Sequence, residues 1–283
     1  MFYNIDTEIT TMKKQSLVSD ADIETFWEDG VVCLRGLFTD WIEKLEQGAA
    51  FHIANPSQSA LTHKANSHSG EFLEDFCCWN RIPEYTDFVH NSSLGQIAAN
   101  LMKSNTAQFF HDHFLYKEAS SGVPTPWHQD QPYYCVDGEQ TVSLWVPLNA
   151  RDRSVSLRCA AGSHLLPREI RPTSWSSNES FYSDDNNFMD IPNIDNNEFE
   201  IKQWSMQPGD AVAFNFRTIH GANANTLSTA NRTLSFRLIG DDVKYRDRGG
   251  RTSPNFPDIN QNNGEPLRSD WFPIIYDAQH SIV

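Results

Sequence analysis

A series of short strand-like segments in the second half of the chain limits the fold most strongly. Residues 107–117, 141–148, 211–216 and 231–240 are rich in aromatic and β-branched side chains. Turn-forming residues separate these segments, and no amphipathic helices alternate with them. Short strands in this arrangement favour a sandwich or barrel. We therefore expect an α+β fold whose mainly β core is a double-stranded β-helix, a jelly-roll barrel of the cupin kind.

The first third of the chain has a different pattern. Residues 19–30, 40–53 and 93–103 have helical spacing of apolar side chains, and Ser19 or Asp20 could cap the first of these helices. Residues 31–37 read as a short strand. We expect these helices to pack on one sheet of the barrel.

No Pro/Gly/Ser-rich linker divides the chain, so residues 1–283 are expected to form one domain. Within it we predict a mainly helical part at 1–106, a jelly-roll core at 107–240 and a C-terminal extension at 241–283. The core carries a polar insertion at 172–200, which is either a surface loop or a lid over a pocket.

The composition excludes several classes of partner. The net charge is −15 and there is no basic stripe, which argues against nucleic acid and anionic membranes. The cysteine count is odd, without a C-x-x-C pair, so we expect free thiols in a reducing compartment. Residues 1–15 lack an apolar signal core, and no apolar run is long enough to span a membrane. These observations predict a soluble cytoplasmic protein that acts on a small molecule; the oligomeric state is not predicted.

A potential metal site begins with His128 and Asp130. Residues two apart on an extended backbone point to the same face, so both side chains can reach one ion. His220 follows another strand-like segment and supplies a third ligand. Two histidines and one carboxylate form the facial triad of non-haem Fe(II) oxygenases, which leaves positions for a co-substrate and dioxygen. The H-x-D pattern alone is weak, since a hydrogen-bonded histidine on a surface strand has the same spacing.

Arg232 is a further candidate, at the start of the segment 231–240. A planar guanidinium can bind the distal carboxylate of 2-oxoglutarate through two hydrogen bonds. The alternative is a surface charge at the beginning of a strand.

Taken together, these motifs resemble the phytanoyl-CoA dioxygenase-like family of Fe(II)/2-oxoglutarate-dependent oxygenases. The resemblance extends over most of the chain, because the motifs follow one another in the family's order. They are DIETFWEDGVVCLRGLF at 22–38, WHQD at 127–130, LWVPLNA at 144–150, AGSH at 161–164, MQPGDAVAFNFRTIHGA at 206–222 and NRTLSFRL at 231–238.

The resemblance implies roles for individual residues. His128, Asp130 and His220 would be the iron ligands and catalytic centre, Arg232 would bind the distal carboxylate of 2-oxoglutarate, and Trp145 would lie beside this co-substrate. One departure is Ala222, which stands where some members of the family have a hydroxyl group that contacts 2-oxoglutarate. Tyr116, Thr218 or Asn223 could supply the missing hydrogen bond.

The resemblance also implies a reaction: dioxygen-dependent hydroxylation of an aliphatic C–H bond, with release of succinate and CO2. Asp130 favours hydroxylation over halogenation, because halogenating relatives carry a small residue in its place. A metal-dependent cupin-like hydrolase or isomerase and a non-catalytic metal-binding barrel remain as alternatives.

The sequence says less about which residues contact the substrate. The candidates for substrate contact lie near the triad or on neighbouring strands: His113, Gln129, Tyr133, Tyr134 and Arg158. The tyrosines could instead pack in the core. Arg158 and Arg237 could bind an anionic substrate group or lie on a solvated sheet face. His111, His113 and Lys117 share one face of their strand and either line the pocket or lie on an open sheet edge. Because the chain is acidic, we expect a small polar metabolite or secondary-metabolite scaffold rather than a CoA ester.

Overall fold

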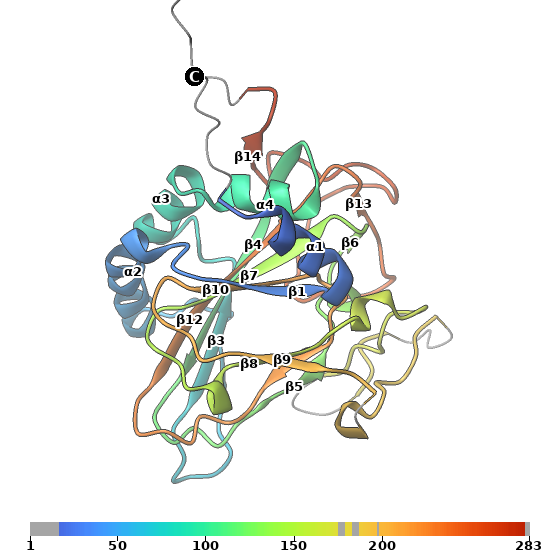
Figure 1. Cartoon of the computed structure of the whole chain (residues 1–283). Coiled ribbons are helices and arrows are strands. Elements are labelled where there is room, and N and C mark those ends of the chain that lie inside the picture. The colour runs from blue at the N-terminus through green and yellow to red at the C-terminus, as the bar shows by residue number, and fades with distance from the viewer. Residues whose placement is uncertain (1–16, 175–178, 183–186, 197, 281–283) are drawn as a thin grey trace, which may run out of the picture.

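A computed structural model of the chain describes residues 17–174, 179–182, 187–196 and 198–280. Three layers are visible in Figure 1: helices, a large sheet and a smaller sheet that faces it. The helices lie on one side of the large sheet, and the smaller sheet lies on the other. The three predicted metal ligands lie between the two sheets.

The helices begin and end where the sequence provides caps. Helix α1 (Asp20–Asp29) has a capping box in which Ser19 and Asp22 bond each other's backbone N–H groups, and it ends at Gly30, whose φ of 73° suits glycine. The other α-helices are α2 (Ile42–Ala54), α3 (Pro83–Asn91) and α4 (Leu94–Met102). The 3₁₀ helices are η1 (Thr39–Trp41), η2 (Gln131–Tyr133), η3 (Arg153–Val155), η4 (Ser163–Leu165) and η5 (Ile194–Asn196).

The large sheet has eight antiparallel strands, in the order β1-β10-β7-β12-β4-β3-β2, with β14 also paired to β4. Its strands are β1 (Val31–Leu34), β2 (Leu61–His63), β3 (Phe72–Phe76), β4 (Thr106–Lys117), β7 (Thr141–Pro147), β10 (Ala211–Phe214), β12 (Asn231–Ile239) and β14 (Ile274–Asp277). Strands from the helical N-terminal part and from the C-terminal segment thus extend the sheet that carries the core.

The smaller sheet has four strands in the order β5-β11-β8-β9. They are β5 (Thr125–His128), β8 (Leu157–Ala160), β9 (Ile201–Gln203) and β11 (His220–Ala222). A separate pair consists of β6 (Val136–Asp137) and β13 (Lys244–Tyr245).

The side chains of β12 alternate between two environments. Leu234, Phe236 and Leu238 point to the helices and belong to the main hydrophobic core. The intervening residues, among them Thr233 and Arg237, point to the space between the sheets. This alternation decides which polar residues of the strand can reach the site.

The elements predicted from periodicity are confirmed, with bounds shifted by a few residues. The helices expected at 19–30, 40–53 and 93–103 correspond to α1, α2 and α4, and the four main strand segments correspond to β4, β7, β10 and β12. The jelly-roll architecture is also confirmed, but its sheets do not close into a barrel: within the described residues no strand pairing joins the two sheets. None of the helices in this part of the chain could cross a membrane.

Candidate metal centre and adjoining cavities

The three predicted metal ligands converge between the sheets. His128 is the last residue of β5 and His220 is the first of β11, and antiparallel pairing places the two directly opposite each other. Asp130 follows β5, where the chain turns into η2 and has helical backbone angles (φ −75°, ψ −47°). The expectation that Asp130 lies on an extended strand with His128 is therefore wrong. The turn is held because the N–H groups of Asp130 and Gln131 both donate to the Phe216 carbonyl.

The geometry of the triad suits a cation. Nε2 of His128 and of His220 lie 3.6 and 3.7 Å from Oδ1 of Asp130, and the candidate ligand atoms all lie within 4.8 Å of one another. Each histidine has its Nδ1 at a backbone carbonyl, that of Pro126 for His128 (2.8 Å) and of Thr218 for His220 (2.9 Å). Donation from Nδ1 fixes the tautomer that leaves the Nε2 lone pair free for a metal. One ion can thus contact all three residues.

Asp130 is kept ionised by its neighbours. Burial alone would raise the pKa of its carboxyl group, but the Arg237 guanidinium outweighs burial and holds the pKa well below its usual range. The Arg237 guanidinium lies 3.3 Å from Oδ2 of Asp130, and the Ser143 hydroxyl donates to the same oxygen at 3.1 Å. With Oδ2 occupied, Oδ1 is the oxygen that faces the two histidines.

His220 is held in its neutral form. Burial and the neighbouring His128 lower its pKa to about 3. A neutral imidazole is the form that binds a metal, so the site does not have to lose a proton from His220 before an ion enters.

Two cavities meet at the triad. The first contacts His128 and His220 and extends between the sheets past Trp145 toward the far ends of β4 and β12. The second cavity, of about 320 Å³, contacts His128 and Asp130 and is also lined by the aromatic side chains of Phe76, Tyr133 and Phe181. His113, His128 and Arg237 line both cavities. A metal ion at the triad would therefore face two separate binding spaces.

A comparison of the sequence with protein-family models supports the same interpretation of the site. Residues 26–233 match the family described as phytanoyl-CoA dioxygenase (PhyH). The chain belongs to this family. No curated protein sequence matches it significantly.

Solved structures with the same fold are only distantly similar in sequence. The epimerase SnoN from nogalamycin biosynthesis, in complex with Fe³⁺, α-ketoglutarate and nogalamycin RO, has a TM-score of 0.69 and 19% identity over 90% of this chain and 97% of its own. The carbocyclase SnoK from the same biosynthesis has a TM-score of 0.67 and 20% identity over 91% and 96%. EctD from S. alaskensis with 2-oxoglutarate and 5-hydroxyectoine has a TM-score of 0.67 and 17% identity over 90% and 88%. The iron and 2-oxoglutarate expected from the sequence agree with the ligands named for the SnoN and EctD structures.

Arg232, Trp145, Tyr116 and Thr218 were expected at the co-substrate. Of these four residues, only Trp145 lines the first cavity. Arg232 points the other way, toward α2, where its Nε and a terminal nitrogen donate to the Glu46 carboxylate at 2.7 and 2.8 Å. Tyr116 packs against the helix-side core, and the Thr218 hydroxyl donates to the Gly30 carbonyl. The distal-carboxylate role expected for Arg232 is not supported, because a strand alternates its faces and Arg232 is on the helix face.

Of the five residues expected to contact the substrate, three line the second cavity and two line neither cavity. His113, Tyr133 and Tyr134 line the second cavity. Gln129 is buried beneath the site, and its side chain accepts a hydrogen bond from the Ile170 N–H. The Arg158 guanidinium lies over the Trp127 ring at 4.5 Å, and Arg158 lines neither cavity. Part of the insertion at 172–200 lies outside the described residues; of the rest, Thr173 and Phe181 line the second cavity.

The sequence interpretation did not identify Ser143, Glu74 or Arg151 as residues of the site. It gave Arg237 only as a candidate for an anionic substrate group and left open whether Lys117 lines the pocket. Ser143 and Arg237 contact Asp130. At the second cavity, Glu74 accepts a hydrogen bond from His63 (2.8 Å), and its other carboxylate oxygen lies 3.2 Å from Nε2 of His113. Burial raises the pKa of Glu74, but the two histidines outweigh it and lower the pKa to about 2. Arg151 and Lys117 line the first cavity. The alternation in β12 was the available signal, since Arg237 is an odd-numbered residue on the strand's inner face.

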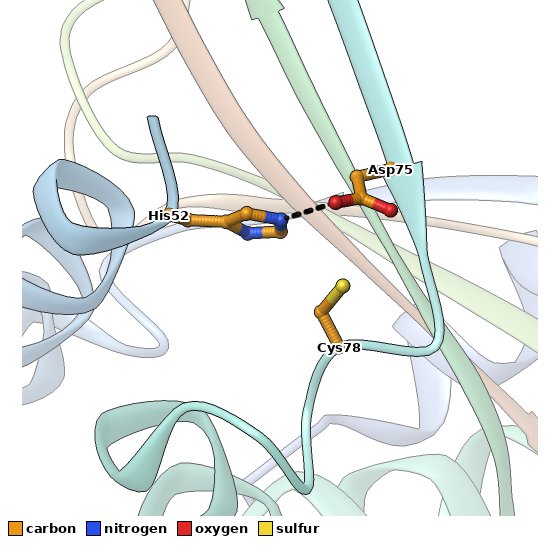
Figure 2. A group of neighbouring side chains, drawn as sticks. All are labelled: His52, Asp75 and Cys78. Atoms are coloured by element: carbon orange, nitrogen blue, oxygen red, sulfur yellow. Dashed lines mark hydrogen bonds and ion pairs between the residues drawn. The ribbon is translucent and has the colours of Figure 1, made fainter. Parts of the chain in front are cut away.

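A second group of potential metal ligands lies behind the large sheet. Figure 2 shows His52 from α2, Asp75 from β3 and Cys78 from the loop after β3 pointing toward one another. Asp75 is already satisfied, because it accepts hydrogen bonds from His52 Nε2 (2.9 Å), from the backbone and hydroxyl of Ser57, and from the Phe76 N–H. Burial raises the pKa of Asp75, and these hydrogen bonds outweigh burial and hold it low. The group is accounted for as a buried hydrogen-bonded pair that joins α2 to the sheet.

Proposed function

We propose that this protein is an Fe(II)- and 2-oxoglutarate-dependent dioxygenase that hydroxylates an aliphatic C–H bond of a small-molecule metabolite, with release of succinate and CO2. The observation that carries the proposal is the position of the triad at the meeting point of two cavities. Such an enzyme must bring a co-substrate and a substrate to one ion from different directions. Membership of the family supports the same reaction class.

The protein's part in the reaction follows from the geometry. Nε2 of His128, Nε2 of His220 and Oδ1 of Asp130 would hold the iron. Iron and 2-oxoglutarate, when bound, supply the oxidising chemistry with dioxygen. Arg237 and Ser143 hold Asp130 in one orientation through Oδ2, so Oδ1 would be the oxygen that contacts the ion.

The second cavity is suited to a small substrate with an apolar part. Phe76, Tyr133 and Phe181 provide aromatic walls, and Tyr133 is fixed because its hydroxyl group donates to the Thr173 carbonyl at 2.8 Å. Glu74 provides an ionised group that a substrate can contact. Rigid walls beside the triad hold one C–H bond near the reacting centre and exclude water.

The alternatives make different use of the site. A cupin-like hydrolase or isomerase would need the metal but no co-substrate cavity, and a non-catalytic barrel would need neither dioxygen nor turnover. The neighbouring SnoN and SnoK structures are named as an epimerase and a carbocyclase, so hydroxylation is the part of the proposal that requires a product analysis.

An anaerobic titration tests the proposal. Purified protein receives one equivalent of Fe(II) and then 2-oxoglutarate, and we expect a weak visible charge-transfer band. Asp130→Ala should lose both the band and the consumption of 2-oxoglutarate, whereas the control Asp40→Ala, at an exposed position on η1, should retain both. Absence of the band in protein shown to contain iron would refute the proposed co-substrate.

The substrate is to be found by succinate release. Each compound class is added aerobically with Fe(II) and 2-oxoglutarate, and the product is analysed by mass. An increase of one oxygen atom per succinate is expected. A product with unchanged composition or with two hydrogens fewer would replace hydroxylation by epimerisation or desaturation.

A further inference from the structure

Lys117 is a buried cation without an acidic partner. It ends β4, its residue is 7% exposed, and its ammonium group donates to the Thr125 hydroxyl at 3.1 Å and to the Asn223 carbonyl at 3.4 Å. The ammonium also lies 4.6 Å from the centre of the Phe72 ring. Among the described residues, no carboxylate lies within ion-pair distance of it. The direct contacts of this buried charge are all neutral groups, and Glu74 acts on it only from beyond ion-pair distance. Such a charge is costly, so this arrangement favours an anionic ligand.

Arg151 is a second cation at the same place. It is 3% exposed, and one terminal nitrogen donates to the Arg232 carbonyl at 2.6 Å and to the Thr233 hydroxyl at 3.1 Å. The other terminal nitrogen donates weakly to backbone carbonyls of Asn149 and Ala150. In the described part of the chain it too has no carboxylate at ion-pair distance. Two like charges of this kind at one cavity need an anion between or beside them.

The first cavity has a chemical order along its length. His128 and His220 line it at one end of β5, Lys117 donates to Thr125 at the other end of this strand, and apolar side chains such as Trp145 line it as well. A ligand that fits this order has a metal-chelating head, a short apolar middle and an anionic tail. A 2-oxo dicarboxylate has these three parts.

Strand pairing explains why these cations replace Arg232. Asn231 and Lys117 are direct partners in the pairing of β12 with β4, and both side chains line the cavity. Arg232 is one residue further along and therefore lies on the opposite face. Its guanidinium is already occupied by both oxygens of Glu46.

We propose that Lys117 and Arg151 bind the distal carboxylate of 2-oxoglutarate and that Arg232 takes no part in binding it. This inference rests on the proposed function. Lys117 supplies an ammonium donor, and Arg151 supplies a positive charge that is held by the backbone of β12 and of the segment after β7.

The test compares two ligands that differ only in the tail. 2-Oxopentanoate has the chelating head and the chain length of 2-oxoglutarate, with a methyl group in place of the distal carboxylate. Anaerobic titration of the iron-loaded protein, followed by the charge-transfer band and by calorimetry, gives both dissociation constants. Wild-type protein should bind 2-oxoglutarate more tightly, and Lys117→Met should weaken 2-oxoglutarate about 10- to 100-fold while leaving 2-oxopentanoate unchanged. Arg232→Met should keep the wild-type preference, and Lys117→Arg should keep most of it.

Thermal unfolding separates a binding role from a structural role. Lys117→Met should leave the melting temperature of the ligand-free protein unchanged or higher, because an unpaired buried charge is removed, and should lose the stabilisation by 2-oxoglutarate. Arg151→Lys serves as a second variant that keeps the charge but loses the planar contacts; it should weaken 2-oxoglutarate selectively.

The possible outcomes are distinct. If Lys117→Met retains the wild-type preference for 2-oxoglutarate, or if Arg232→Met loses it, the inference is overturned while the proposed function stands. If the iron-loaded wild-type protein binds neither ligand, the proposed co-substrate is wrong and the inference falls with it. Equal weakening of both ligands in Lys117→Met also overturns the inference, since it indicates damage to the chelating end.

Discussion

The affinity for 2-oxoglutarate should fall as the pH rises from 7 to 9. Burial lowers the pKa of Lys117 from 10.5 to about 8 in the ligand-free protein. An anion bound to the ammonium group should restore the pKa toward its ordinary value, so binding favours the protonated form. About nine-tenths of Lys117 is charged at pH 7 and about one-tenth at pH 9, which predicts an affinity about tenfold weaker at pH 9.

The stability of the ligand-free protein should change with pH in the opposite direction to its affinity for 2-oxoglutarate. Because the folded protein holds its Lys117 proton less tightly than the unfolded chain, this group stabilises the ligand-free fold progressively as the pH rises through the window from about 8 to 10.5. The difference between these two pKa values corresponds to about 3 kcal/mol. Ligand-free protein should therefore gain stability from Lys117 in the same pH range in which it loses affinity for the co-substrate.

Calorimetry of the nickel-substituted protein provides the assay, because nickel avoids oxidation of the metal at high pH. The measured quantity is the ratio of the dissociation constants of 2-oxoglutarate and 2-oxopentanoate at pH 7, 8 and 9. In this ratio, titrations at the metal end cancel. Lys117→Arg is the matched control, since a guanidinium stays charged throughout, and its ratio should not change with pH. A wild-type ratio that is constant from pH 7 to 9, or a Lys117→Arg ratio that falls with it, would refute the reasoning.

Three further predictions concern other residues. Arg232→Met should lower the free energy of unfolding, measured in urea, by about 1 kcal/mol, because a partly exposed bidentate ion pair with Glu46 is lost. A loss of affinity for 2-oxoglutarate in this variant would instead show that Arg232 contributes to binding. Arg237→Leu should weaken metal binding about 10- to 100-fold with little change in fold, since Asp130 loses its orienting contact; metal affinity equal to wild type in a titration would contradict this role. His52→Ala should cost about 3 kcal/mol of stability because Asp75 loses a buried partner, and the protein should still bind one equivalent of iron; a reduced metal stoichiometry would show that the pair holds a metal.

Most of the main helices and strands, and the candidate metal ligands, could be predicted from the sequence. The strand segments follow from aromatic and β-branched composition between turn residues, and the three main helices predicted in the first third follow from apolar spacing and caps such as Ser19. His128, Asp130 and His220 could be identified because ligand type and order along the chain are local properties. The same is true of membership of the family, which rests on the order of motifs. Helix α3 and the strands β2 and β3 were not predicted, since tertiary contacts rather than periodicity stabilise such short elements.

Which charged side chains face the triad and its two cavities depends on the tertiary structure. A strand alternates its faces every residue, so the boundary and pairing of β12 determine whether Asn231 or Arg232 faces the cavity, and composition does not fix that register. Lys117 comes from β4, and Arg151 follows β7; they lie at one cavity only because β4 and β7 both pair with β12. The positions of cations brought together by sheet pairing depend on contacts distant in sequence. For this reason the candidate metal ligands could be predicted from the sequence, while the grouping of Lys117 and Arg151 at the first cavity could not.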